Sequence, residues 1–284
     1  MPFSYLANPR ETRAVLERHG LAPRYRLGQN FLVNDDVIGR ILNLAELDSS
    51  DVVYEVGPGI GTLTVAMLPR VKTVVAVEAD RSLPDVLAQT CTDYEERLAL
   101  VQGDALRVDA TQLEQAAGEV PNKLVSNLPY QVAATLILDV LQSMSSVGRL
   151  VVMVQAEVAD RISAVAGTKA YGAYSAKLAL WGKVTGRFEV SPHNFMPPPH
   201  VDSAVVRIDR IPSPCQDCAQ VATVIDAAFA QRRKTIRNSM AAKGFDKEQI
   251  DEAFASAAID PRVRAETLCV DDFVRLAQEL RVGS

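Results

Sequence analysis

The chain has 284 residues, of which 48% are hydrophobic, with a formal net charge of −5 and four cysteines. This length allows one large domain or a large domain with a smaller one, and the apolar content suffices for a full core without disulfides or a structural metal. The net negative charge argues against a globally basic nucleic-acid binder, so any contact with RNA must come from a local basic patch.

The cellular compartment is predicted from the N-terminal sequence, the length of the apolar runs and the cysteines. No charged-then-apolar signal is present at the N-terminus and no apolar run reaches ~18 residues, so we expect a soluble, cytoplasmic protein with no membrane partner. Cys215 and Cys218 form a C-x-x-C pair without a second pair, and the histidines lie far away in sequence. We interpret this pair as part of a reduced loop and predict no metal site.

Residues 1–50 are predicted to form a helical extension. Asn8 caps a helix that begins at Pro9, because proline at the first helical position lacks only an N–H that would be unpaired anyway, and Gly20 ends it. Residues 24–32 have no clean period, and taken alone they are an ordinary loop with its apolar residues in the core. A second helix is expected to begin at residue 35 or 36.

From residue 52 onward, strand and helix patterns alternate, which indicates a doubly wound, Rossmann-like parallel sheet. Such sheets bind ligands beyond the carboxyl ends of their strands. Two later strands, separated by a proline-rich turn, are expected to add an antiparallel edge. The predicted strands are 52–56, 73–77, 98–102, 123–126, 150–154, 185–190 and 203–208.

The first strand runs into a glycine turn and then into a helix start. Gly57, Gly59 and Gly61 free the backbone for close approach by a ligand, and N–H groups at a helix start suit a polar one. A dinucleotide fingerprint would place its third glycine at position 62, where Thr62 stands. The spacing instead resembles motif I of class I methyltransferases, which bind S-adenosylmethionine. A glycine-rich surface turn without a ligand is the alternative.

Three polar residues end successive strands of the predicted sheet: Glu78, Asp104 and Asn127. The Glu78 carboxylate can accept hydrogen bonds from two ribose hydroxyls, as in dinucleotide binders. Asp104 can accept a hydrogen bond from an adenine amino group, although taken alone it is equally well a helix N-cap.

Asn127-Leu128-Pro129-Tyr130 can activate an exocyclic adenine nitrogen, which is a poor nucleophile because its lone pair is delocalised into the ring. The Asn127 side-chain carbonyl and a main-chain carbonyl of the Leu128–Pro129 turn can accept its hydrogens, and Pro129 holds that turn. Tyr130 offers a face on which an extruded base stacks, with Phe195 either opposite it or packed in the core. The alternative is a strand-to-helix turn with Asn127 as cap.

Residues 211–217 are punctuated by proline and predict a domain boundary, with a helical domain over 211–284 after a first domain over 1–210. Helices are expected near 218–230, 232–243, 247–257 and 271–281. A run of cations is the best candidate for contact with an RNA backbone, although such a run is often only a solvated helix face. It contains Arg232, Arg233, Lys234 and Arg237.

Taken together, these motifs resemble the KsgA/RsmA family of small-subunit ribosomal RNA adenine dimethyltransferases over nearly the whole chain. The ordered set is specific where each motif alone is weak. It comprises residues 27–32, 55–61, 77–78, 103–105, 127–130, 155–161, 171–172, 195–199, 201–206 and 229–238.

The resemblance implies a class I methyltransferase domain, with a mostly parallel seven-stranded sheet, and a small all-helical C-terminal domain. It implies transfer of four methyl groups from S-adenosylmethionine to N6 of two adjacent adenosines in the 3′-terminal hairpin loop of 16S rRNA, within an immature small subunit. It assigns Asn30 and Leu32 to the methionine end of the cofactor and the glycines to the backbone beneath it. Glu78 is assigned to the ribose, Asp104 to the adenine, and Asn127 to both cofactor and target base. We expect a monomer that does not act on DNA.

Two departures bear on the substrate: Ala156 stands where the family often has lysine, and the chain is less basic than is usual. The nearest alternative is an Erm-type large-subunit rRNA methylase, which shares the Gln-Asn-Phe motif at 29–31 and the Asn-x-Pro-Tyr turn. A DNA adenine methylase lacks support because no target-recognition domain fits in this length. An assembly factor whose binding matters more than its catalysis, and a nicotinamide-dependent oxidoreductase, are the remaining classes.

Overall fold

A computed structural model of the chain describes residues 2–23 and 29–280. Residues 24–26, the Leu27-Gly28 part of the predicted cofactor motif and the final residue of the last predicted helix lie outside these ranges. The chain divides into two compact units, the first over residues 1–159 and 184–210 and the second over 160–183 and 211–284.

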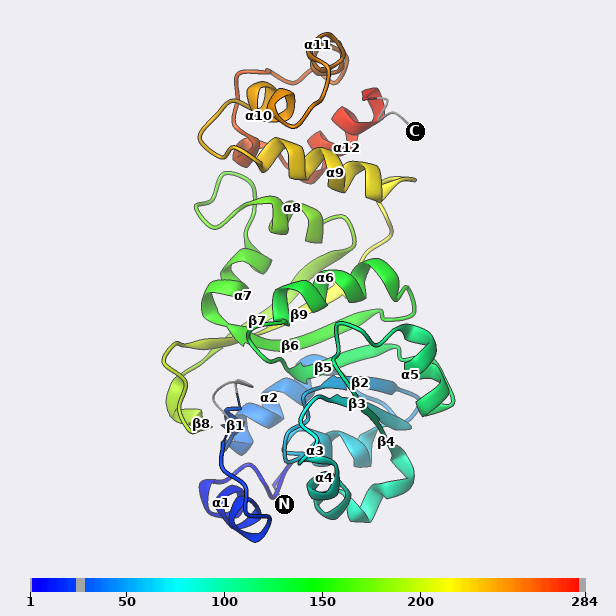
Figure 1. Cartoon of the computed structure of the whole chain (residues 1–284), viewed down its shortest axis with the longest axis vertical. Helices are drawn as coiled ribbons and strands as arrows, with labels where there is room; N and C mark the ends of the chain where they lie inside the picture. The colour runs from blue at the N-terminus through cyan, green and yellow to red at the C-terminus, as the bar shows by residue number, and fades with distance from the viewer. Residues whose placement is uncertain (1, 24–28, 281–284) are drawn as a thin grey trace. The chain divides into compact units, whose positions relative to one another are not determined.

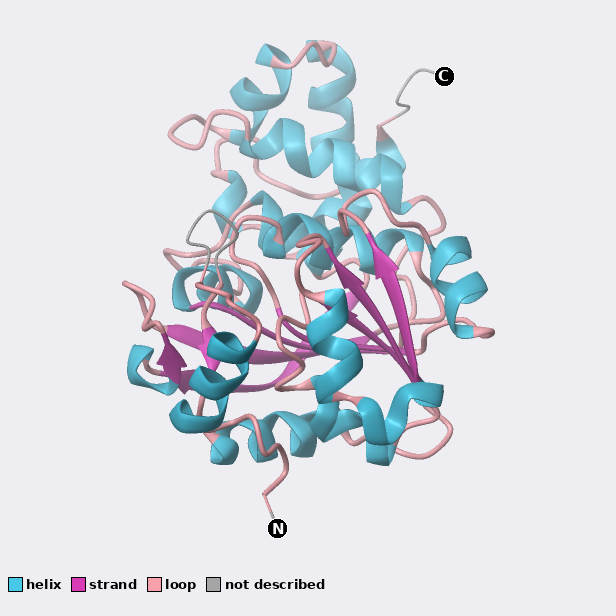
Figure 2. Cartoon of the chain, turned by 60° about the horizontal axis from the view of Figure 1, so that its bottom comes forward, coloured by secondary structure: helices cyan, strands magenta, loops and turns pink. Residues whose placement is uncertain are grey.

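The first unit is built on a seven-stranded sheet in the order β4-β3-β2-β5-β6-β9-β7 (Figures 1 and 2). Strands β2 to β6 pair in parallel, and β9 pairs antiparallel to β6, with Gln155 opposite Ser203. The two later strands, β7 and β9, join the sheet next to each other, as predicted. However, β9 lies inside the sheet and only β7 is at its edge. The strands are β2 Val52–Val56, β3 Thr73–Glu78, β4 Leu98–Gln102, β5 Lys123–Asn127, β6 Arg149–Gln155, β7 Gly182–Val190 and β9 Ser203–Arg210.

Helices cover both faces of this sheet, as central strands buried on both faces, such as β2 and β3, require. The α1–α4 side contributes to one core with alternate strand residues such as Val53, Val74 and Val151. Figure 1 shows α5 and α6 on the opposite side of the sheet from α3 and α4. The helices of this unit are α1 Pro9–Arg18, α2 Asp35–Ala45, α3 Thr64–Met67, α4 Pro84–Thr90, α5 Ala110–Ala117, α6 Ala133–Ser143 and the start of α7 Ala156–Ser163, with short 3-10 turns at Leu68–Arg70, Thr92–Arg97 and Pro192–Asn194.

Capping explains where the first helices begin. Asn8 accepts hydrogen bonds from the amides of Arg10 and Glu11, as predicted for a helix that starts at Pro9. The helix α2 is capped by Asn34, whose side chain accepts from the amide of Asp36. The expected start at residue 35 or 36 is therefore correct, and its cap lies one residue earlier.

A second, two-stranded sheet was not predicted. β1 Phe31–Leu32 pairs antiparallel with β8 Phe195–Met196, with Phe31 opposite Met196 and Leu32 opposite Phe195. The interpretation of residues 31–32 as loop is wrong, although both side chains are in the core as expected. Next to this sheet, the side-chain amide of Asn34 donates to Oδ1 of Asn194 at 2.8 Å. This hydrogen bond ties the N-terminal extension to a residue 160 positions away in the sequence.

The second unit is helical and has its own core. It contains the end of α7, α8 Ala173–Leu178, α9 Cys218–Phe229, α10 Ile236–Ala242, α11 Lys247–Ser256, a 3-10 turn at Ala265–Thr267 and α12 Val270–Glu279. The predicted division at 210/211 coincides with one of its borders, but residues 160–183, expected in the first domain, belong to the second unit. The reason is packing: Ala176 and Leu180 share a core with Ile225 and Phe273.

Candidate active site

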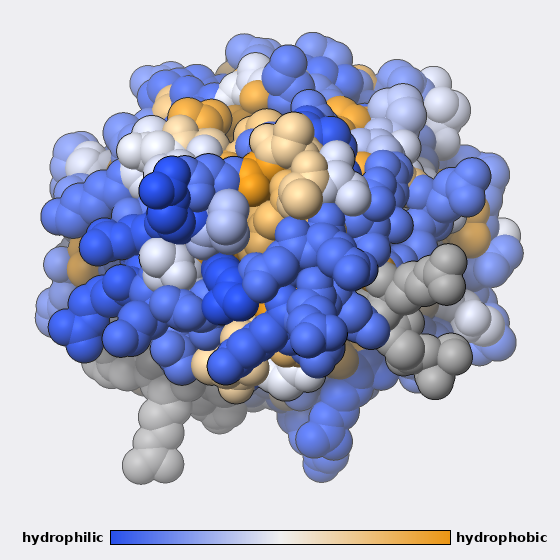
Figure 3. Space-filling model, turned by 90° about the horizontal axis from the view of Figure 1, so that it is seen from above, coloured by the Kyte–Doolittle hydropathy of each residue, from blue (hydrophilic) through white to orange (hydrophobic). Residues whose placement is uncertain are grey.

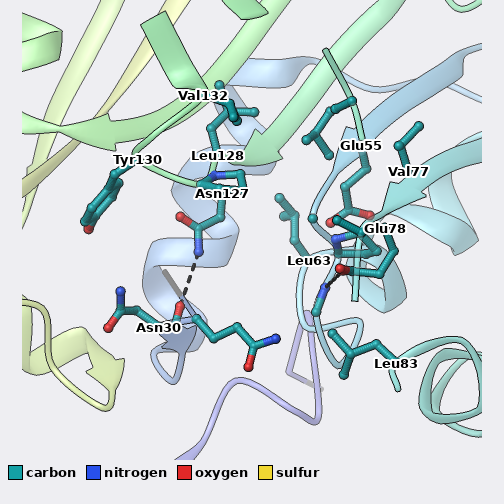
Figure 4. A pocket seen from close by; sticks show the side chains of 18 of the residues that line it. Asn30, Glu55, Leu63, Val77, Glu78, Leu83, Asn127, Leu128, Tyr130 and Val132 are labelled. Carbon is teal, nitrogen blue, oxygen red and sulfur yellow. Dashed lines mark hydrogen bonds between the residues drawn. The ribbon is translucent and has the colours of Figure 1, made fainter. Parts of the chain in front are cut away.

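A cavity opens at the carboxyl ends of β2, β3 and β5, entirely within the first unit, and Figure 4 shows its side chains. This is the edge at which parallel sheets bind ligands. Each of the five segments that line it contains residues singled out by the sequence analysis, and the end of β2, before the glycine turn, forms its floor. It is lined by residues 29–32, 55–59, 77–79, 103–105 and 127–132, together with Thr62, Leu63 and Leu83.

The glycine turn after β2 has two separate uses. Gly57 has φ +65°, and a Cβ placed there would lie 3.2 Å from Cγ of Pro129, so the residue lets the two loops of the cavity approach. Gly61, with φ +89°, does not line the cavity. A Cβ on Gly61 would meet Oγ1 of Thr90 at 3.1 Å, so this glycine allows α4 to approach rather than a ligand. The predicted placement of Gly61 under the cofactor is therefore not seen among the cavity-lining residues.

Glu78 ends β3 and is held by backbone donors. The amide of Gly59 donates to Oε2 at 3.3 Å, and the amide of Asp80 donates to Oε1 at 2.7 Å. Burial raises the pKa of this carboxyl, while these two hydrogen bonds oppose the shift. A carboxyl fixed in this way at a strand end has lone pairs left to accept hydrogen bonds from a ribose.

Asp104 lines the same cavity and is exposed. Its Oδ1 accepts from the amide of Leu106 at 3.0 Å, and its Oδ2 lies 3.7 Å from Nε of Arg107. Asp104 therefore caps a turn and not a helix, because the next helix, α5, is capped by Asp109. It faces the cavity, as its other predicted use requires.

Asn127 ends β5 across the cavity from Glu78. Its Nδ2 donates to the carbonyl of Asn30 at 3.4 Å, which orients the side chain so that Oδ1 is left for another donor (Figure 4). The carbonyl of Pro129 accepts the amides of Val132 and Ala133, which begin α6. In the part of the chain that the structure describes, no hydrogen bond to the Leu128 carbonyl is found. Of the two carbonyls in the turn, that of Leu128 is therefore the one available to a ligand.

Tyr130 lines the cavity and is half-buried, whereas Phe195 does not line it. The Tyr130 hydroxyl lies 2.7 Å from the hydroxyl of Ser203 at the start of β9. Phe195 is 4% exposed, because its pairing with Leu32 places it in the core of the first unit. Stacking of a base between these two rings is not supported, and the packing role left open for Phe195 is the one observed.

Three of the four cations of the run, Arg232, Arg233 and Lys234, lie in a turn over residues 231–235 and not in the predicted helix, because Thr235 caps α10 at Ile236. The fourth, Arg237, lies in the first turn of α10. Arg232 donates to the carbonyls of Lys169 and Tyr171 at 2.8 and 3.1 Å. Arg237 forms a bidentate pair with Asp251 at 2.5 and 2.6 Å. Arg233 and Lys234 are exposed and have no ion pair among the described residues. The surface seen from the α10 and α11 end is mostly hydrophilic (Figure 3).

Sequence reasoning missed several cavity residues. Nε2 of Gln29 donates to Asp80 at 2.9 Å, and Glu55 pairs with Thr64 on the cavity floor. Gln29 and Glu55 stood inside motifs that were recognised, but no role was given to either side chain. The Ser203 contact carries no local signal, because it depends on which strand β9 joins.

Metal and membrane sites can be assessed for residues 2–23 and 29–280 only. In these ranges no group of three or more potential metal ligands comes together, and Cys215 and Cys218 are free thiols. None of the helices described combines the length and the apolar character needed to cross a bilayer.

Sheet order and cavity together place the chain among the class I S-adenosylmethionine-dependent methyltransferases. The cavity fits that cofactor: a held carboxyl stands at the end of β3, a second acid at the end of β4, and a glycine turn leaves the backbone open between them. A model of the family described as ribosomal RNA adenine dimethylase matches residues 20–281. The chain belongs to this family.

Named relatives agree. The chain is 43% identical over 274 residues to the ribosomal RNA small subunit methyltransferase A of Acidothermus cellulolyticus, covering 94% of this chain and 92% of that one. It is 42% identical to the enzyme of the same name from Thermobifida fusca, covering 96% of each. A dimethyladenosine transferase of Plasmodium falciparum has a similar structure, with a TM-score of 0.76, 24% identity and 87% and 95% coverage. The 23S rRNA methyltransferase ErmE aligns with a TM-score of 0.67, 21% identity and 88% and 99% coverage, which supports the shared fold.

Proposed function

We propose that this protein transfers methyl groups from S-adenosylmethionine to N6 of two adjacent adenosines in the 3′-terminal hairpin loop of 16S rRNA, dimethylating each. The observation that carries the proposal is the turn after β5, where the Asn127 side chain and the Leu128 carbonyl offer acceptors beside a cavity suited to the cofactor. The relatives that match over nearly full length are named for small-subunit rRNA methylation.

In the cofactor subsite, Glu78 accepts hydrogen bonds from the ribose and Asp104 from the adenine amino group. Asn30 and Leu32 lie at the methionine end, and Gly57 and Gly59 leave space along the backbone. The bound cofactor supplies a methyl group already activated by its sulfonium.

In the target subsite, the adenine N6 donates its two hydrogens to Oδ1 of Asn127 and to the carbonyl of Leu128. Both acceptors draw the lone pair out of conjugation and aim it at the methyl group, so catalysis is mainly proximity and orientation. The proton leaves after transfer and no general base is required. Pro129 fixes the turn and Tyr130 provides the face on which the extruded base stacks.

The sequence identity to named relatives favours the small ribosomal subunit over the large one as the substrate. Relatives named for the small-subunit reaction are about 40% identical along nearly the whole chain, whereas ErmE is 21% identical. The basic turn at 231–235 gives the second unit a local contact for the phosphate backbone despite the negative net charge. We propose that the protein acts as a monomer, in the cytoplasm, on an immature small subunit.

The test is methyl transfer from labelled S-adenosylmethionine to small subunits isolated from cells that lack this modification, followed by nucleoside analysis. We expect N6,N6-dimethyladenosine in small subunits only, with large subunits and DNA as parallel substrates. Label in large-subunit RNA would favour the Erm-type reaction instead. The Asn127→Ala protein should transfer no methyl group. If it nevertheless restores growth of a deletion strain fully, binding to the subunit is the main role.

A further inference from the structure

Glu55 is a carboxyl group on the floor of the cofactor cavity, and among the described residues it has a single side-chain partner. It lies in the central strand β2, is 2% exposed, and lines the cavity. Its Oε2 accepts a hydrogen bond from Oγ1 of Thr64 at 2.7 Å, and Thr64 is itself fully buried. Among residues 2–23 and 29–280, no lysine, arginine or histidine forms an ion pair with it. Within the described residues, a carboxyl group is thus held in the cavity without a counter-charge.

The titratable neighbours of Glu55 make its negative charge less favourable. Glu78, from the adjacent strand β3, acts on it as a second carboxyl, and Figure 4 shows the two side chains on the same side of the cavity. The thiol of Cys91, at the end of α4, also interacts with it. Burial raises the pKa of Glu55 from 4.5 to about 8, against the lowering effect of the Thr64 hydroxyl. At neutral pH this shift favours the protonated form of the carboxyl group.

The two forms of the cofactor differ in charge at one atom. S-adenosylmethionine carries a permanent positive charge on its sulfonium, whereas the product S-adenosylhomocysteine has a neutral thioether there. Ribose, adenine and amino-acid groups are the same in both. A site that binds both through Glu78 and Asp104 alone has no electrostatic means to prefer the reactant and release the product.

We propose that Glu55 provides this preference: its carboxyl loses a proton when the positively charged cofactor binds and regains one when methyl transfer has removed the charge. The inference rests on the use of S-adenosylmethionine in the proposed function and adds a residue that sets cofactor-over-product specificity. It makes no demand on the RNA. The proton passes to solvent on cofactor binding and returns from solvent before product release, so the turnover as a whole is balanced.

Calorimetric titration of the full-length protein tests this without catalysis, with S-adenosylmethionine and S-adenosylhomocysteine as the two probes. Below the pKa of Glu55, release of one proton strengthens S-adenosylmethionine binding by about tenfold per pH unit. Between about pH 5.5 and about pH 7 the α-amino group of either probe stays protonated. We expect S-adenosylmethionine affinity to rise across this range more steeply than that of S-adenosylhomocysteine. Buffers of different ionisation enthalpy should report a released proton for S-adenosylmethionine only.

Two variants sharpen the test. Glu55→Gln keeps the shape and cannot ionise, so the two probes should show the same pH dependence and the preference for S-adenosylmethionine should fall. Thr64→Val removes the hydroxyl that favours the ionised form, so the rise in affinity should move to higher pH. Because Glu78 contacts a ribose present in both probes, its own titration cancels in the comparison.

The outcomes separate the two claims. Equal proton release and equal pH dependence for both probes in the wild-type protein would overturn the role of Glu55 and leave the proposed methyl transfer intact. Failure of both probes to bind at any pH would overturn the cofactor assignment and this inference with it. A Glu55→Gln protein that keeps the wild-type difference between the probes would also contradict it.

Discussion

The hydroxyl of Tyr130 lies 2.7 Å from the hydroxyl of Ser203, which joins the turn after β5 to the first residue of β9. Ser203 is fully buried and Tyr130 is only half-buried. The serine is therefore the fixed end of this pair, and it holds the aromatic ring at the mouth of the cavity. Through this contact, a strand added antiparallel to the sheet positions a residue of the target subsite.

Replacing Ser203 with alanine should lower methyl transfer without changing cofactor affinity. Loss of one hydrogen bond costs about 1 kcal/mol, or about fivefold in kcat/KM, because the ring is no longer held in place. Tyr130→Phe removes the same bond and should cost about as much. The double variant should be no worse than either single variant, and additive losses would show that the two hydroxyls act separately.

Replacing Gly57 with alanine should destabilise the protein and weaken cofactor binding. A side chain at φ +65° costs about 1–2 kcal/mol, and the new Cβ would also press on Pro129. Gly148→Ala is the matched control, because its backbone is not left-handed and nothing lies within 4 Å of its Cβ position. Chemical denaturation with and without S-adenosylmethionine measures both effects. Equal stability of the two variants would refute the close approach of the two loops.

The four cations near residue 235 should differ in their effect on RNA binding. Arg233 and Lys234 are exposed without an ion pair among the described residues, whereas Arg232 and Arg237 bind other groups of the protein. Arg233→Ala with Lys234→Ala should leave stability unchanged, weaken binding to small subunits, and make the dependence of log K on log salt shallower by about two. Arg232→Ala should instead lower stability by about 1 kcal/mol, because Arg232 donates to two carbonyls of the same unit. Filter binding at several salt concentrations, with thermal melts, distinguishes them. The reverse pattern would place the RNA contact on Arg232.

The cofactor-free protein should lose stability as pH rises from about 4.5 toward 8, through Glu55. In this window the folded state keeps a proton on the carboxyl that the unfolded chain has already released, since the pKa of Glu55 is raised from 4.5 to about 8. With more protons bound in the folded state, the free energy of unfolding falls with pH. Urea denaturation should show a smaller decline for Glu55→Gln. An identical decline in both proteins would mean that Glu55 is ionised throughout.

Much of the sheet and half of the site could be predicted from the sequence, and for the same reason. Strands such as β2 and β3 are buried on both faces and appear as continuous apolar runs. The carboxyl ends of parallel strands share one edge, so Glu78 and Asn127 were expected in one place and both line the cavity. Here, local pattern and tertiary arrangement carry the same information.

The rest depends on partners far away in sequence. The two-residue strands β1 and β8 are too short to have a periodic pattern, and their pairing puts Phe195 in the core. The turn before α10 was missed because the cap at Thr235 lies inside a run of cations that resembles a helix face. Residues 160–183 were assigned to the wrong unit because only packing, not composition, shows which core Leu180 joins.

The path of the chain between β6 and β9 bears on how the protein is made. During synthesis, β6 emerges with the edge that later pairs with β9 still open. The chain then passes into residues of the second unit and through β7 before β9 arrives to cover that edge. The methyltransferase sheet therefore cannot close until about three quarters of the nascent chain has left the ribosome. A gene fragment that stops after the sheet would also leave the apolar residues of α8 exposed, because the helices that cover them come later in the chain. The second unit is thus interleaved with the first along the chain, so no single cut in the gene separates the two units.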